Sequence, residues 1–158
     1  MSVSNDTSGR LQAIAVRNIE FFRPKAEDIP WELLAAGAAG LNAEQLRSTL
    51  DLDYTRVACR IEPPATIGVY AMLPVGTLRF DLISVAVVPE LQGQLVGRRL
   101  LGHALGLAES KAAREVYLNI CVDNARGLDM ARRYGFVPVE SAADDSDTRQ
   151  LCFELTPE

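Results

Sequence analysis

The sequence predicts a single α/β domain in which a mixed central sheet of about six to seven strands is flanked by about four helices. Three observations lead to this prediction. Short apolar runs rich in β-branched residues alternate along the chain with segments of helical periodicity. Tight turns join the strands in the middle of the chain, which favours antiparallel pairing there. A helix separates two later strands, which favours a parallel pair.

Composition narrows the class of protein further. The chain has 158 residues, of which 48% are hydrophobic and 23% charged, and its formal net charge is −5. This balance is typical of one globular domain, and the negative charge argues against nucleic acid as an obvious partner. We expect neither a signal peptide nor a membrane span, and therefore a cytoplasmic protein. The three cysteines are widely spaced, so neither a disulfide framework nor a metal site is expected.

The chain is expected to begin with a tail and a strand. Residues 1–11 are polar and predict a flexible tail, so the domain is expected to span residues 12–158. Residues 13–22 show partial alternation of apolar and polar side chains, which predicts a first strand that ends before Pro24.

Two short helices are expected next. Asp28 as a cap and Pro30 in the first turn predict the start of one helix, which ends at the glycines that follow. Asn42 is expected to cap a second helix, Ala43 to Leu50, because its side chain can accept a hydrogen bond from a free amide of the first turn.

Three strands follow in quick succession, over residues 54–62, 66–73 and 77–88, with proline or glycine at the turns between them. They are expected to form an antiparallel meander. The last of them is long for a single strand, so a β-bulge is predicted near Ser84 or Val85.

The stretch from Ile83 to Leu107 holds a strand, a glycine-containing turn and a helix start within a few residues. Pro89 ends the strand, and apolar residues recur at helical spacing from Val96 onward. The free amides of a first helical turn favour an anion such as phosphate, and Arg98 and Arg99 add positive charge there. An ordinary strand–helix turn with solvated arginines explains the loop alone equally well.

The C-terminal third is predicted to contain a strand over residues 115–121, a helix from Ala125 to Tyr134 and a final hairpin over residues 136–139 and 150–155. Asn124 is expected to cap the helix and Gly135 to close it.

Residues 85–101, VAVVPELQGQLVGRRLL, resemble the acetyl-CoA-binding motif of the GNAT superfamily of N-acetyltransferases, whose core is Gln/Arg-x-x-Gly-x-Gly/Ala. Gln92 and Gly97 fill the outer positions, and Leu95 stands in place of the central glycine. The strand at 115–121, Asn124, the next helix and Tyr134-Gly135-Phe136 resemble the second half of the family pattern. The resemblance covers roughly residues 54–155, most of the chain.

The resemblance implies a GNAT-like domain that uses acetyl-CoA as co-substrate. In the family a bulge separates the motif strand from its neighbour and opens a slot for the pantetheine arm. Backbone groups of Val85 and Val87 are then expected to pair with this arm, with the Val87 N–H facing the thioester carbonyl. The residues implied in cofactor binding are Val85, Ala86, Val87, Gln92, Gly93, Gln94, Leu95, Val96, Gly97, Arg98, Arg99 and Asn124.

The same resemblance indicates candidates for the general base and the general acid. Asp81 occupies a position where some family members carry a carboxylate, and it is the candidate base; the alternative is a surface carboxylate paired with Arg79. The family's usual tyrosine position falls on Ala131. Tyr134 is therefore a weak candidate for the acid, and packing is the alternative. His103, the single histidine, is interpreted as a packing residue of the central helix.

In the family, the two-helix segment near the N-terminus shapes the acceptor pocket, so Trp31 and Leu46 are weak candidates for acceptor binding, with core packing as the alternative. The function implied is transfer of an acetyl group to a primary amine of a small molecule or peptide by direct attack in a ternary complex. A non-catalytic acyl-CoA-binding or regulatory domain is the alternative, and homodimers are common in the family.

Overall fold

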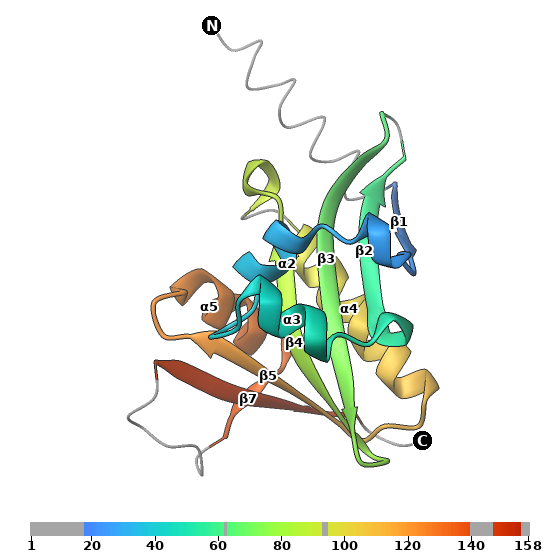
Figure 1. Ribbon diagram of the computed structural model, residues 1–158. Helices are drawn as coiled ribbons and strands as arrows, with labels where there is room; N and C mark the ends of the chain where they lie inside the picture. Colours follow the sequence, from blue (N-terminus) through green and yellow to red (C-terminus); the bar gives the residue numbers. More distant parts are fainter. Residues whose placement is uncertain (1–17, 62, 93–94, 140–146, 156–158) are drawn as a thin grey trace, which may run out of the picture.

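The computed structural model describes residues 18–61, 63–92, 95–139 and 147–155 (Figure 1). The predicted tail at residues 1–11 and the first residues of the predicted N-terminal strand lie outside them. The strands are β1 (Ile19–Phe22), β2 (Thr55–Arg60), β3 (Ala65–Val75), β4 (Arg79–Val87), β5 (Glu115–Cys121), β6 (Val137–Pro138) and β7 (Thr148–Glu154). The helices are α2 (Trp31–Ala36), α3 (Ala43–Thr49), α4 (Val96–Ser110) and α5 (Ala125–Tyr134), with short 3-10 turns η1 (Ala26–Asp28), η2 (Leu52–Tyr54) and η3 (Pro89–Leu91).

These elements confirm the predicted fold class. The strands form one seven-stranded sheet in the order β1-β2-β3-β4-β5-β7-β6. β1 to β4 are antiparallel neighbours, whereas β4 and β5 are parallel because α4 carries the chain back between them. In Figure 1, α2 and α3 lie in front of the sheet and α4 lies behind it. No helix in the described part of the chain is long and apolar enough to cross a membrane.

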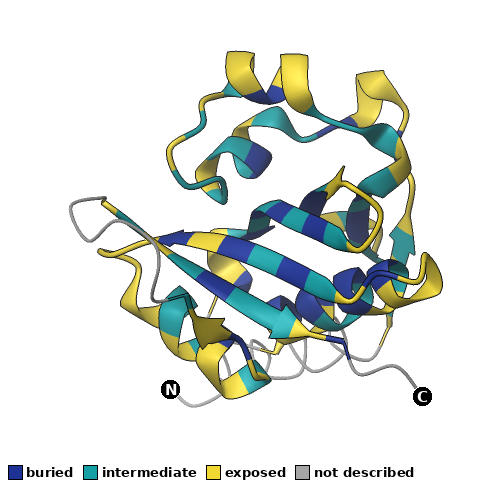
Figure 2. Cartoon of the chain, turned by 90° about the horizontal axis from the view of Figure 1, so that it is seen from below, coloured by how far each residue is buried: buried dark blue, intermediate teal, exposed yellow. Residues whose placement is uncertain are grey.

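Each face of the sheet has its own core, as the buried positions in Figure 2 indicate. The smaller core lies under α2 and α3 and centres on Leu34 and Leu46, both fully buried. The larger core joins α4 and α5 to the other face, and Leu100, Leu101 and Ala131 are fully buried in it. Burial of these apolar side chains is the main force that fixes helices to both faces.

A β-bulge interrupts β4. Ala71 pairs with Ser84 and Met72 pairs with Leu82, so Ile83 has no partner across the β3–β4 ladder. The predicted bulge is therefore present, one residue before the expected position.

The bulge reverses which residues of β4 face which core. Phe80 and Leu82 pack in the α4-side core, but Ala86 belongs to the α2-side core. Buried Ser84 also faces α2, where its hydroxyl donates a 2.6 Å hydrogen bond to the carbonyl of Leu34. Regular alternation would have placed all four side chains on one face.

The N-terminal helix begins later than the sequence predicts. Asp28 does not cap it but ends η1, and α2 begins at Trp31 with Pro30 at the cap position. The cause is local, because a residue before proline is disfavoured in the helical region and Ile29 is extended, with φ −74° and ψ 126°. Asn42, by contrast, caps α3 as predicted and forms a capping box with Gln45.

His103 packs on α4 as interpreted from the sequence. Its Nδ1 lies 2.7 Å from the hydroxyl of Tyr70, and its ring stacks on Phe21 with 4.1 Å between centroids. Burial lowers the pKa of His103 below its ordinary value, and the positive charges of Arg56 and Arg99 lower it further.

Candidate active site

β4 and β5 separate over the second half of β4. The two strands pair only over Arg79–Leu82 and Glu115–Leu118, whereas β4 continues to Val87 and β5 to Cys121. The separation starts at the bulge, which bends and twists the strand that contains it. The sequence-based expectation of an open slot between these two strands is met.

The edge of β4 that faces this slot is polar backbone. The Val88 N–H donates to the Ile67 carbonyl on β3 at 2.9 Å. Since alternate residues of an antiparallel strand turn their backbone groups to opposite sides, Val85 and Val87 direct theirs away from β3. The Gln92 side-chain amide indeed donates to the Val87 carbonyl from that side, at 3.2 Å.

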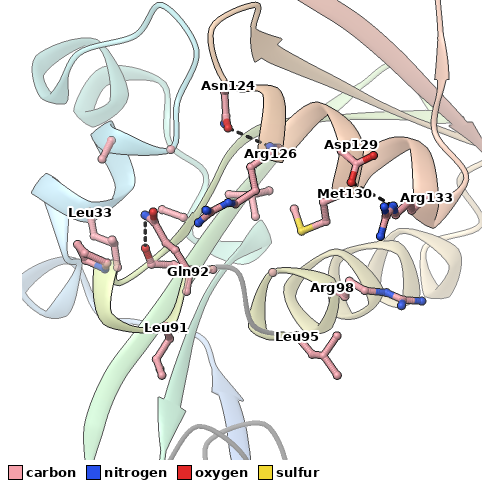
Figure 3. Close-up of a pocket in the computed structure, with 18 residues that line it drawn as sticks. Leu33, Leu91, Gln92, Leu95, Arg98, Asn124, Arg126, Asp129, Met130 and Arg133 are labelled. Atoms are coloured by element: carbon pink, nitrogen blue, oxygen red, sulfur yellow. Dashed lines mark hydrogen bonds and ion pairs between the residues drawn. The ribbon is translucent and has the colours of Figure 1, made fainter. Parts of the chain in front are cut away.

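A cleft of about 420 Å³ opens along this edge between β4, α2, the start of α4 and α5 (Figure 3). The residues that line it are Leu33, Ala36, Gly37, Val85, Ala86, Val87, Pro89, Leu91, Gln92, Leu95, Gly97, Arg98, Asn124, Arg126, Gly127, Asp129, Met130 and Arg133. We call it the main cleft. It brings together predicted residues from β4, the loop and the α5 cap that are far apart in the sequence.

A second cavity of about 470 Å³ continues from the main cleft through the opening in the sheet. The two cavities share Gly37, Val85, Asn124 and Met130 among their lining residues. The second cavity extends to the ends of β5 and α2, where its walls include Asn119, Cys121, Asp123 and the small residues Ala36–Ala39. A long ligand in the main cleft could therefore meet a second molecule inside the protein.

Gly37 brings the end of α2 against β4. A Cβ built on Gly37 would overlap the Val85 carbonyl oxygen and lie 2.6 Å from its carbon and 2.7 Å from the Cβ of Ala86. The Gly37 carbonyl accepts a 3.4 Å hydrogen bond from the Val85 N–H. This contact forms one wall of both cavities, and the sequence analysis did not identify it.

Leu95 does not distort the turn before α4. Its φ of −78° and ψ of 5° are open to any residue, so a glycine is not required there. Its side chain is 55% exposed and points away from the centre of the cleft in Figure 3. Gly97 is different, because a Cβ there would come within 2.6 Å of the Met130 sulfur across the cleft.

The remaining predicted loop residues divide into two groups. Gly93 and Gln94 lie outside the described residues. Val96 is fully buried in the α4-side core, and neither Val96 nor Arg99 is among the residues that line the two cavities. In the first turn of α4, Gly97 and Arg98 line the main cleft.

Arginines from α5 are functional candidates that the sequence analysis missed. Arg126 and Arg133 line the main cleft with Arg98, and Asp129 on the same helix face forms a 3.0 Å ion pair with Arg133. The sequence signal for them was the spacing of Arg126, Asp129 and Arg133, which places all three on one face of the helix after Asn124. Asn124 caps this helix by accepting a 2.9 Å hydrogen bond from the Gly127 N–H.

The predicted catalytic residues lie outside both cavities. Asp81 forms a 2.7 Å ion pair with Arg79, whose guanidinium stacks 3.7 Å above the Tyr117 ring. The hydrogen bond to Asp81 raises the pKa of Arg79. Tyr134 packs against Phe153, with 6.0 Å between ring centroids, and directs its hydroxyl to α4 instead of the slot.

The predicted acceptor residues also lie outside the two cavities. Leu46 is fully buried in the α2-side core because the apolar face of α3 turns it toward the sheet. Trp31 lies under the Arg47 guanidinium, 4.9 Å from the ring centroid. Leu33 and Ala36 of α2, with the C-cap residue Gly37, are the residues that the structure brings to the main cleft from this segment.

Solved structures with the same fold cover nearly the whole chain. An IAA acetyltransferase from Bacillus cereus ATCC 14579 aligns with a TM-score of 0.73 at 22% identity, over 87% of this chain and 99% of its own. A GNAT family acetyltransferase from Elizabethkingia anophelis, solved with acetyl-CoA bound, gives 0.71 at 21% identity over 87% and 99%. Ard1 from Thermoplasma volcanium gives 0.72 at 14% identity over 89% and 99%. Identities this low establish the shared fold alone.

Sequence comparison identifies the family. A search of curated protein sequences found no significant match. The model of the acetyltransferase (GNAT) family matches residues 37–136, more than half of the chain. The match begins at Gly37, the C-cap of α2, and includes the bulged strand, the motif loop and α5, which form most of the walls of the main cleft. The chain therefore belongs to the acetyltransferase (GNAT) family.

Proposed function

We propose that the protein is an N-acetyltransferase that transfers the acetyl group of acetyl-CoA to a primary amine by direct attack in a ternary complex. The observation that carries the proposal is the edge of β4 beyond Leu82, which β5 leaves unpaired beside a slot lined by both cavities. An extended, amide-containing arm can add to such an edge like a further strand. The acetyl-CoA bound to the Elizabethkingia anophelis relative supports this choice of donor.

The residues of the main cleft suit the two ends of acetyl-CoA. The start of α4, with Arg98, suits a phosphate group, because free amides and a full positive charge meet there. The Val85 carbonyl and the Val87 N–H are the groups of this edge that the proposal assigns to the pantetheine arm, since the Val85 N–H donates to Gly37 and the Val87 carbonyl accepts from Gln92. The thioester supplies an activated acetyl group, and in this proposal the Val87 N–H stabilises the negative charge that develops on its oxygen.

The acceptor amine enters through the second cavity in this proposal. An amine attacks only as the neutral form, so a nearby group must accept its proton. Asp123 lines this cavity, and Asp81 lies just before the point where β4 and β5 separate. The leaving thiolate needs no dedicated acid, because a thiol with a pKa of about 8.5 takes a proton from water. The acceptor is a small-molecule or peptide amine.

The alternative, an acyl-CoA-binding domain without turnover, is favoured by one observation. The family's usual tyrosine position holds Ala131, which is fully buried, and Tyr134 faces α4. The two functions share ligand binding and differ in turnover.

The test is release of free thiol from acetyl-CoA with a broad panel of amines, measured over background hydrolysis. Turnover above background with any amine supports the proposal, and binding without turnover across the panel favours the alternative. The pH–rate profiles of Asp81→Asn and Asp123→Asn then identify the proton acceptor, since only loss of the base removes the fall in rate at low pH, where that base is protonated. If both variants keep the wild-type rate and profile, neither carboxylate is the base.

A further inference from the structure

The two cavities differ in the charge of their walls. Arg98, Arg126 and Arg133 line the main cleft, and Asp129 is the one carboxylate among its described lining residues. Among the described residues that line the second cavity, Asp123 is the one carboxylate, and none is a lysine, an arginine or a histidine. A charged group that leaves water needs a partner of opposite charge. The second cavity therefore suits a cationic or neutral molecule and lacks a partner for an anionic one.

The polar side chains of the second cavity lie together at the end of β5. Asn119 and Cys121 are alternate residues of this strand, and they face away from the α4-side core that contains Leu118 and Ile120. Asp123 follows in the turn before α5. The exposed side chains of Asn119 and Asp123 have no hydrogen-bond or ion-pair partner within the described ranges. Both are therefore free to contact a ligand in the second cavity, which they line.

Most of the remaining wall of the second cavity is apolar. Leu101, Ile120 and Met130 contribute to it, with the small residues at 36–39 on the side of α2. Asn124 also lines it, but its side-chain oxygen already accepts the hydrogen bond that caps α5. The volume of about 470 Å³ is in the range of sites for small molecules. These walls suit an uncharged carbon skeleton, and they leave the polar contacts of an acceptor to the end of β5.

A carboxylate on the acceptor would find no favourable place in this cavity. An amino acid carries its carboxylate on the carbon next to the amino group, so both groups enter the site together. The carboxylate would lose water against apolar walls or approach Asp123, and no cationic side chain from the described lining residues would compensate it. Since Asp123 is exposed, solvent screens part of the repulsion, and we expect discrimination of about tenfold.

We propose that the acceptor is a small alkylamine or arylalkylamine without a carboxylate, and that the second cavity excludes the corresponding amino acid. The inference rests on the proposed function, because it assumes that the acceptor enters through this cavity. It deepens that function by naming the class of acceptor. The amine nitrogen forms a bond to the acetyl carbon as the carbon–sulfur bond breaks, and the nitrogen loses a proton to the base. The products are the N-acetylamine and the CoA thiolate, which takes up a proton from water.

Release of CoA thiol by the full chain, measured with matched acceptors, tests the inference. One set is tyramine, tyrosinamide and tyrosine, and a second is isobutylamine, valinamide and valine. Within each set the skeleton is constant, and the amide keeps the bulk of the carboxylate without its charge. Compared as the neutral amine, the first two members are expected to show kcat/KM about tenfold above that of the amino acid.

The other outcomes separate this inference from the proposed function. An amino acid used as well as its amide overturns the inference and leaves the proposed function intact. An amide rejected as strongly as its amino acid also overturns it, because bulk and not charge then excludes both. Turnover confined to peptides overturns the small-molecule class in the same way. No turnover with any amine, amino acid or peptide refutes the inference and the proposed function together.

Asn119→Lys adds a positive charge to the second cavity at an exposed position. It is expected to raise kcat/KM for the amino acid relative to its amine by about tenfold. Glu154→Gln is the matched control, because it changes the net charge by the same amount at an exposed residue of β7 that does not line the cavity. Glu154 pairs with Glu115, four residues or about 13 Å along β5 from Asn119. A wild-type ratio in Asn119→Lys, or an equal shift in Glu154→Gln, overturns the inference.

Discussion

The substitution Gly37→Ala tests the contact between α2 and β4. The backbone of Gly37, with φ −91° and ψ −1°, suits alanine, so any effect arises from the added methyl group. That methyl group would overlap the carbonyl of Val85 and lie 2.7 Å from the Cβ of Ala86. These are backbone or short, rigid groups that cannot rotate away, so the end of α2 must move from the strand.

The expected cost follows from the separate terms. Forcing a methyl group into a closed contact costs about 1–3 kcal/mol. Loss of the Gly37–Val85 hydrogen bond adds about 1 kcal/mol to this destabilisation. The reduced conformational freedom of the unfolded chain with alanine lowers it by about 0.5 kcal/mol. The net loss is about 2 kcal/mol, which for a domain of this size lowers Tm by about 4–8 °C.

Thermal unfolding followed by circular dichroism measures the change, with Gly106→Ala as the control. Gly106 lies on the exposed face of α4, and a Cβ there meets nothing within 4 Å. Alanine at this position is expected to stabilise the protein by about 0.5–1 kcal/mol through helix propensity. The two glycine substitutions therefore shift Tm in opposite directions. A wild-type Tm for Gly37→Ala would refute the steric argument.

Three further substitutions follow from the same structure. Ser84→Ala is expected to lose about 1 kcal/mol in urea unfolding, because it removes the buried hydrogen bond to Leu34; an unchanged midpoint would contradict this. Asn124→Ala removes the α5 cap and is expected to cost about 1 kcal/mol. It should also weaken acetyl-CoA binding in calorimetry, because Asn124 lines both cavities, and stability loss with unchanged affinity would separate the two roles. For His103, the folded pKa lies below the ordinary value of about 6.5, so the unfolded chain takes up a proton that the folded protein resists. The stabilising effect of the neutral ring is therefore complete above about pH 6.5 and is lost as the pH falls below it. In urea unfolding, the free energy of unfolding of His103→Gln is expected to fall less between about pH 8 and about pH 5 than that of the wild-type protein. Identical pH dependence in the two proteins would show that His103 does not contribute.

Features with a local cause were predictable from the sequence. The capping box of Asn42 and Gln45 and the cap at Asn124 depend on residues three apart. Gly135 closes α5 with φ 126°, a conformation that glycine adopts without strain. The meander and the parallel β4–β5 pair also followed, because connection type limits the topology.

Features that depend on contacts between distant segments were not predictable in the same way. The residue at which β4 bulges is set by its register with β3, so the sequence predicted only that the bulge lies near Ser84 or Val85. The contact of Gly37 with Val85 joins segments almost fifty residues apart. Asp81 matched a family position in the sequence and Tyr134 lay three residues beyond one, but the positions of their side chains depend on Arg79, Gly102 and Phe153, which no local pattern specifies.

The bulge at Ile83 divides β4 into two parts on which mutation acts differently. Before the bulge, the side chains of Phe80 and Leu82 pack in the α4-side core, so a change in their volume lowers the stability of the fold. After it, the slot is bordered by peptide groups that every residue except proline provides in full. Val85 and Val87 can therefore be replaced by other β-formers with little change in that border. Evolution can alter the side chains of this strand freely while the peptide edge persists, which is compatible with a shared fold at 14% identity.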